Sequence, residues 1–231
     1  MSCPLCQERK EKRFCPAVHG KICAQCCGEQ REVTLDCPSD CTYLLQSRAQ
    51  SRQPARQHDT AGADGGFDRD ALFPEVEISE QFLYEREHLI VGLSYALAKS
   101  ARGGRSLDGH ALNDRDLIAA LTSLAKSYQT LVESSLIYEQ PTANLAHQQI
   151  AREVATMVKE FREAEEKHLG YSRLRDSEVL QALVFLLRMG VTRTSGRPKS
   201  RAYVDFLFAQ FPESQSAIAA PESPGSGLII P

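Results

Sequence analysis

Eight cysteines lie within the first 41 residues, and no cysteine follows Cys41. Thiolates bind soft metals, form disulfides or act as nucleophiles. Dense cysteines form disulfide frameworks in oxidising compartments, but the opening MSCPLCQERK lacks the apolar core of a signal peptide. The sequence therefore favours metal binding, and we expect zinc.

The cysteines are spaced as zinc ligands usually are. They read Cys3-x2-Cys6, Cys15-x3-His19, Cys23-x2-Cys26-Cys27 and Cys37-x3-Cys41. Ligands two or three residues apart can share a tight turn, which brings both sulfurs within about 2.3 Å of one ion. Proline follows Cys3, Cys15 and Cys37, where its fixed φ favours such a turn. Nine candidate ligands predict two tetrahedral sites.

Successive ligand pairs usually interleave, the first with the third and the second with the fourth. This predicts that Cys3, Cys6, Cys23 and Cys26 hold one ion. The second ion would take Cys15, Cys37, Cys41 and either Cys27 or His19. The parallel between Cys15-Pro-Ala-Val-His19 and Cys37-Pro-Ser-Asp-Cys41 favours His19, and the thiol-rich surroundings favour Cys27. With four protein ligands each, both sites are closed, which is typical of structural zinc.

This cysteine string resembles the cross-brace zinc modules of the MYND, HIT-finger and B-box types. The resemblance covers Cys3 to Cys41 and implies a small protein-interaction unit with two structural zincs. The string differs from the MYND pattern in ending on Cys37-x3-Cys41 and in its adjacent Cys26-Cys27. The run RFCPAVHGKICAQCCGEQREVTLDCPSDCTYL also resembles the opening of a set of bacterial proteins of unknown function, which implies no activity.

After the module, the sequence predicts a mainly α fold. Apolar residues recur at helical spacing from about Ile78 to Gly103 and, after an Asn113 cap, as far as Ser135. A third helix would begin near Pro141 and end at Gly170. A fourth, capped by Asp176, would run from Glu178 to Met189 and be central, because apolar residues cover most of its circumference. The last helix would span 200–211.

These signals divide the chain into four parts. Residues 1–45 would form the zinc-binding module with short hairpins, one strand being Val33–Leu35. Residues 46–72 have few large apolar side chains, which is typical of a flexible linker. Residues 73–211 would form a helical bundle. Residues 212–231, rich in Pro, Ser and Gly, would form a disordered tail.

Two Glu-x-x-His pairs in the helical part have the spacing used by di-iron carboxylate bundles. They are Glu85-x-x-His88 and Glu165-x-x-His168, and Glu133 and Glu178 could supply the lone carboxylates. Chance alone can yield such pairs, and neither lone carboxylate has a distinctive context, so helix-surface charges and a C-terminal histidine are the preferred explanation. We find no phosphate-binding glycine loop, nucleophile elbow or Cys-His catalytic pair. We therefore expect a protein that is not an enzyme.

The segment 188–201, RMGVTRTSGRPKSR, is basic and contains no acidic residue. It suits nucleic-acid or phosphate binding through Arg193, Arg197, Lys199 and Arg201, and it equally suits a cationic turn after a helix. The whole chain has a net charge of −3. With two Zn²⁺ and eight thiolates the module is also negative, which favours a protein partner over phosphates.

Hydrophobic content of 42% and charged content of 25% are typical of a soluble globular protein. No apolar run reaches the roughly 20 residues of a membrane span. We expect a cytoplasmic interaction or scaffold protein. The alternatives are a regulator that binds nucleic acid through residues 188–201 and a redox-sensitive zinc switch, because zinc-bound thiolates can be oxidised with loss of the metal.

Overall fold

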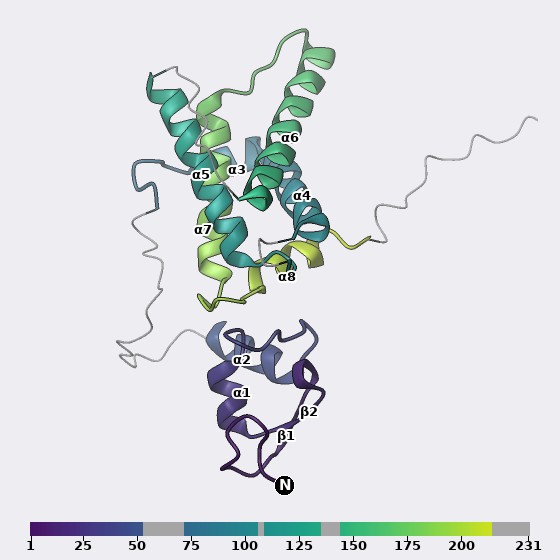
Figure 1. Cartoon of the computed structure of the whole chain (residues 1–231). Coiled ribbons are helices and arrows are strands. Elements are labelled where there is room, and N and C mark those ends of the chain that lie inside the picture. Colours follow the sequence, from purple (N-terminus) through teal and green to yellow (C-terminus); the bar gives the residue numbers. More distant parts are fainter. Residues whose placement is uncertain (53–71, 106–108, 135–143, 214–231) are drawn as a thin grey trace, which may run out of the picture.

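We describe the protein from a computed structural model, which defines residues 1–52, 72–105, 109–134 and 144–213. Outside these ranges lie residues 53–71 of the predicted linker 46–72, the predicted helix start at Pro141 and the predicted tail beyond residue 213. Figure 1 shows a small N-terminal part next to one end of a larger group of helices. The mainly α fold class, with a short hairpin near the N-terminus, is confirmed.

The N-terminal part contains one hairpin and two helices. Strands β1 (Arg13–Cys15) and β2 (Gly20–Ile22) pair antiparallel, with Phe14 opposite Lys21. The 3₁₀ turn η1 (Pro16–Val18) connects them and ends at His19, whose φ of 48° is left-handed. Helices α1 (Ala24–Gln30) and α2 (Thr42–Arg52) complete this part.

The predicted strand Val33–Leu35 is wrong. These residues form a turn in which all three backbone N–H groups donate to the carbonyl of Gln30, at 3.1 to 3.2 Å. Carbonyls at the end of a helix have no partner within the helix, so the last one of α1 is available to close this turn. The hairpin lies instead at residues 13–22, where His19 allows the chain to reverse.

The larger part is a bundle of six helices within the described ranges. They are α3 (Glu80–Glu85), α4 (Glu87–Gly103), α5 (Asp114–Ser134), α6 (Leu145–Leu169), α7 (Asp176–Arg193) and α8 (Ala202–Gln210). The sequence predicts α3 and α4 as one helix. They separate at Arg86 (φ −113°, ψ 21°), whose guanidinium binds Glu178 at 2.9 Å and Glu165 at 3.3 Å.

Local capping signals set most helix ends. The Asn113 side chain accepts hydrogen bonds from the first turn of α5, and Asp116 accepts from the Asn113 backbone, which confirms the predicted cap. Gly170, with φ 80°, ends α6 in the left-handed conformation that glycine favours. Helix α7 is longer than predicted. It is capped at Arg175 and continues to Arg193.

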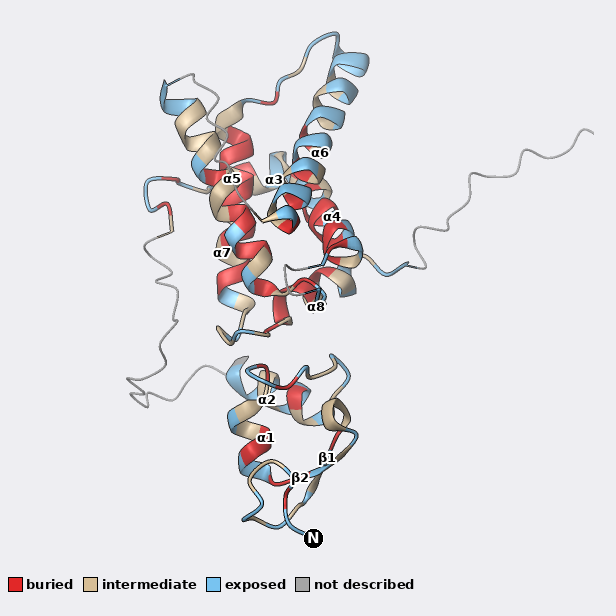
Figure 2. Ribbon diagram, in the orientation of Figure 1, coloured by how far each residue is buried: buried red, intermediate tan, exposed pale blue. Residues whose placement is uncertain are grey.

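Of the described helices, α7 contributes the most buried residues to the bundle core, as its apolar circumference predicts (Figure 2). Ten residues of α7 are buried, including Val179, Leu183 and Leu187. Helix α8 packs closely on α7, because a Cβ atom at Gly190 would lie 2.9 Å from the Tyr203 ring. The Tyr203 hydroxyl donates to the carbonyl of Leu186.

A buried carboxylate joins the start of α5 to the start of α8. Asp114 is fully buried, and one of its oxygens accepts from the backbone N–H groups of Tyr203 and Val204 at 3.0 and 3.1 Å. Its other oxygen accepts from the Ser200 hydroxyl at 2.7 Å. Asp114 therefore caps a helix that lies almost 90 residues further along the chain.

Helix α2 crosses the predicted boundary between module and linker at residue 45, because it continues to Arg52. The division into module, linker, bundle and tail stays a prediction. The two described parts nevertheless touch, and the contacts are described below.

Candidate metal centre

Four cysteines from the two ends of the first 26 residues form one cluster. The sulfurs of Cys3, Cys6, Cys23 and Cys26 all lie within 4.8 Å of one another, and those of Cys6 and Cys23 are 4.0 Å apart. Four thiolates around one Zn²⁺ at about 2.3 Å have sulfurs about 3.8 Å apart. The donor set and its dimensions fit zinc, and the grouping is the one that interleaved pairs predict for the first ion.

Local hydrogen bonds shape this cluster from both sides. Cys3 lies in a tight turn, where its carbonyl accepts from Gln7 and its N–H donates to the carbonyl of Arg9. Its sulfur accepts from the N–H of Cys23 at 3.2 Å. Cys23 is the N-cap of α1, and its sulfur accepts from the N–H of Cys26 at 3.3 Å. The cluster therefore joins the N-terminal turn to the first turn of α1.

The thiols of this cluster differ in acidity. Hydrogen bonds from the backbone and side chain of Arg9 lower the pKa of Cys6 to about 6. The hydrogen bond with the Cys23 thiol, together with burial, raises the pKa of Cys26 to about 12. Thiols this close cannot all ionise without a compensating cation, as in any set of coupled like charges. A bound dication would supply that charge.

The other four cysteines form no such compact group within the described residues, although Cys15 and Cys41 lie close enough to Cys37 to affect it. Burial raises the pKa of Cys37, a hydrogen bond from the Glu32 backbone opposes this, and the thiols of Cys41 and Cys15 raise it further. Cys27 is buried among the packed residues of the module, whereas His19 is exposed. The Cys27 sulfur also accepts a long hydrogen bond from Arg31 at 3.8 Å.

The module contacts the bundle through the loop between α7 and α8. One Arg197 nitrogen donates to the carbonyls of Gly28 and Arg31, at 2.9 and 2.6 Å, where α1 ends. The Lys199 ammonium donates to the Thr34 carbonyl at 3.0 Å and pairs with Asp36 at 2.9 Å. The contact is polar and follows directly from the cationic composition of this loop. The cations of this loop are evident in the sequence, but their partners in the module are not.

Glu32 lies at the centre of the contact and is 3% exposed. Its carboxylate accepts from Arg48 at 2.8 Å and from the Ser195 hydroxyl at 3.0 Å, and its carbonyl accepts from the Lys199 N–H at 2.8 Å. Arg48 also binds Asp205 at the start of α8. Glu32 has a left-handed φ of 53°, which costs a non-glycine residue about 1 kcal/mol. This network of contacts holds it there.

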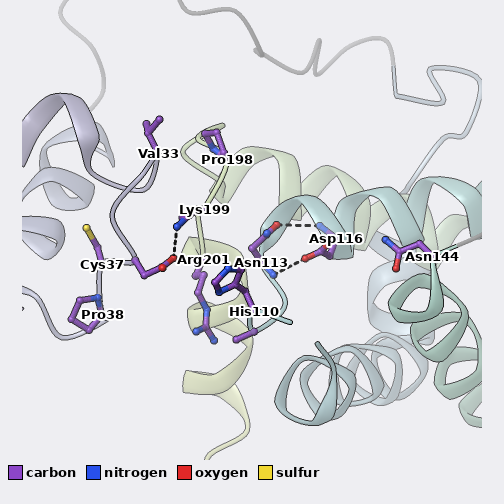
Figure 3. Close-up of a pocket in the computed structure, with 12 residues that line it drawn as sticks. Val33, Cys37, Pro38, His110, Asn113, Asp116, Asn144, Pro198, Lys199 and Arg201 are labelled. Atoms are coloured by element: carbon purple, nitrogen blue, oxygen red, sulfur yellow. Dashed lines mark hydrogen bonds and ion pairs between the residues drawn. The ribbon is translucent and has the colours of Figure 1, made fainter. Parts of the chain in front are cut away.

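A pocket of about 620 Å³ lies where the two parts meet (Figure 3). The module contributes Val33, Asp36, Cys37 and Pro38 to its wall. The bundle contributes residues from the starts of α5 and α6 and from the α7–α8 loop, which are His110, Ala111, Asn113, Asp116, Asn144, Pro198, Lys199 and Arg201. Two of these lining residues, Lys199 and Asp36, form the ion pair between the bundle and the module, and Figure 3 draws a dashed line from Lys199. The pocket therefore exists only while the two parts are in contact.

Three of the four cations proposed for nucleic-acid binding interact with other residues of the chain. Arg197 and Lys199 bind the module, as described above. Arg193 lies over the Phe206 ring, 3.5 Å from its centre, and Arg201 lines the pocket.

The di-iron arrangement is not formed by the residues considered for it. Glu165 and Glu178 bind Arg86, and Glu165 also accepts from Ser172, Arg173 and Leu174. The remaining candidates, Glu85, His88, Glu133 and His168, are all exposed. Within the described ranges, the four-cysteine cluster is the one group of possible ligands at metal-binding distances.

Comparison with protein-family models, curated proteins and solved structures finds no match to this chain. The likeness to cross-brace modules therefore rests on the cysteine pattern alone. In the described part of the chain, no helix combines the length and the apolar character needed to cross a membrane.

Proposed function

We propose that this chain is a non-catalytic zinc-binding protein in which a small metal-held module serves protein interaction. The observation that carries the proposal is the cluster of four thiols within 4.8 Å of one another. Four sulfur ligands close a tetrahedral site and leave no position for water or substrate, which is the arrangement of structural zinc. Cys3, Cys23 and Cys26 are at most 3% exposed, as suits a structural role.

A second zinc ion bound by Cys15, Cys27, Cys37 and Cys41 belongs to the same proposal. Its support is that the thiols of Cys41 and Cys15 lie close enough to Cys37 to raise the pKa of that thiol. The burial of Cys27 and the exposure of His19 favour Cys27 as the fourth ligand. The module would then be a cross-brace, because the ligand pairs of the two ions alternate along the chain.

An interaction or scaffold role suits this architecture better than nucleic-acid binding. Arg197 and Lys199 are already bound to carbonyls and to Asp36 of the module, so phosphates would have to displace them. The zinc-loaded module carries net negative charge, which disfavours phosphate contacts. A partner protein would therefore meet the outer surface of the module or of the bundle.

Zinc content tests the proposal. The purified chain should hold about two equivalents of zinc by elemental analysis. Replacing Cys3 and Cys6 with serine removes half of the ligands of the first site, so at least one equivalent should be lost. Amide dispersion of residues 1–45 should collapse, because a segment of this size buries too little apolar surface to fold without metal.

Single variants assign the second site. Cys27→Ser should lower the zinc content by about one equivalent, and His19→Ala should leave it unchanged. The opposite result would make His19 the ligand. Protein that contains no metal and has intact disulfides by mass spectrometry would overturn the proposed function.

A further inference from the structure

We propose that zinc controls whether the module is docked on the bundle, so that loss of the metal releases the loop from Thr194 to Arg201 and opens the pocket at the junction. This inference rests on the proposed function, because it requires that the cysteine cluster bind zinc. It goes beyond that function in assigning the metal a conformational consequence outside the module.

Most of the docking surface of the module lies between its candidate metal ligands in the sequence, and Arg48, which binds Asp205, lies beyond Cys41. The carbonyls of Gly28 and Arg31, which accept from Arg197, lie one and four positions after Cys27. Glu32, Thr34 and Asp36 precede Cys37. Ser39, whose hydroxyl donates to Asp205 at 2.7 Å, lies between Cys37 and Cys41. The backbone that contacts the bundle is therefore fixed by ligands on both sides.

Helix α1 transmits the state of the first site to this surface. It has seven residues, and helices of that length are not stable alone. Its N-cap and first turn carry Cys23 and Cys26, which the metal would hold against Cys3 and Cys6. Without the metal, we expect α1 to fray, and the carbonyls of Gly28 and Arg31 would no longer converge on Arg197.

The contact itself is of a kind that can open without unfolding the bundle. Within the described ranges, the apolar clusters of the two parts share no residue. The contacts between the two parts described above are hydrogen bonds and ion pairs, and polar interfaces between domains are typically the ones that move. The bundle keeps its own core around α7 in either state.

Amide exchange in the full-length chain measures docking directly. The Lys199 N–H donates to the Glu32 carbonyl across the junction, whereas the Tyr203 N–H donates to Asp114 inside the bundle. Removing zinc with a chelator should raise the exchange rate of the Lys199 amide about tenfold or more, with little change at Tyr203. A Lys199 amide that stays protected after the zinc has left overturns the inference, and so does equal loss of protection at Tyr203.

The variant Arg197→Ala tests the same junction with the metal in place. It should expose the Lys199 amide while the zinc content stays that of the unchanged chain. By linkage, it should also weaken zinc binding by the factor by which zinc strengthens docking. Arg152→Ala, an exposed arginine of α6, is the matched control and should change neither. Unchanged zinc affinity in Arg197→Ala would overturn the coupling.

Zinc analysis separates the two proposals. A chain that binds zinc but keeps Lys199 protected without it loses only the docking inference. A chain that binds no zinc loses the proposed function, and the inference with it.

Discussion

The two parts of this molecule are stabilised by different means. In the module, the buried cluster consists mainly of cysteines, with Ile22 and Leu35 as the other buried members. In the bundle, the buried cluster is built from leucine, valine and other apolar side chains around α7. The comparison shows that the module has clustered cysteines where a larger domain has an apolar core. A substitution in the apolar core should therefore lower the stability of the bundle, whereas a substitution in the cysteine cluster should lower the zinc content of the module.

Breaking the bundle core should have the largest effect on stability. Leu183→Ala removes a side chain with no exposed surface and should lower the free energy of unfolding of the bundle by about 3 kcal/mol. Denaturant unfolding followed by helical circular dichroism measures this. The zinc content should not change. If zinc is lost as well, the bundle is required for the module to fold, and the two parts are not stabilised separately.

Removing the cap that joins α5 to α8 should have the next largest effect. Asp114→Ala leaves the N–H groups of Tyr203 and Val204 without their acceptor and should cost about 2 kcal/mol of bundle stability. Asp114→Asn keeps one oxygen for these groups and should cost less. Thermal melting of the two variants compares them. Equal losses would show that the charge of Asp114, not its acceptor geometry, stabilises α8.

Protonation of Glu165 in acid should have the smallest of the three effects on bundle stability. Burial alone would raise the pKa of this carboxyl, but hydrogen bonds from Ser172, Arg173 and Leu174, with the charge of Arg86, hold the pKa below its ordinary value. A lowered folded-state pKa stabilises the protein above the unfolded value, and this contribution is lost as the pH falls through the folded value.

The measurement is the pH dependence of bundle unfolding below about pH 4.5. Glu165→Gln cannot ionise, so the difference in stability between the two proteins should shrink as the pH falls. A difference that stays constant with pH would show that Glu165 acts only as a neutral acceptor.

The sequence predicts features that depend on neighbouring residues. The cap at Asn113, the end at Gly170 and the apolar stripe of α7 are local signals, and the structure confirms them. The grouping of Cys3, Cys6, Cys23 and Cys26 also matches the prediction, which followed from the interleaving of Cys-x2-Cys pairs. In each of these places, the spacing of residue types along the chain was enough to predict the structure.

Features that depend on distant residues could not be predicted. The break at Arg86 depends on Glu165 and Glu178, which lie 79 and 92 positions away. The junction brings Arg197 to Gly28, 169 positions apart. The cationic character of the loop was evident in the sequence, but nothing local distinguishes a loop that binds phosphates from one that binds helix carbonyls.

The polar junction gives the molecule a defined line of mechanical weakness. Tension applied between the module and α8 would load the hydrogen bonds of Arg197, Lys199 and Arg48, and these break over short extensions. The interlocked side chains around α7 would carry little of that load. Pulled from its two ends, the chain would separate into its parts before either part lost its own structure.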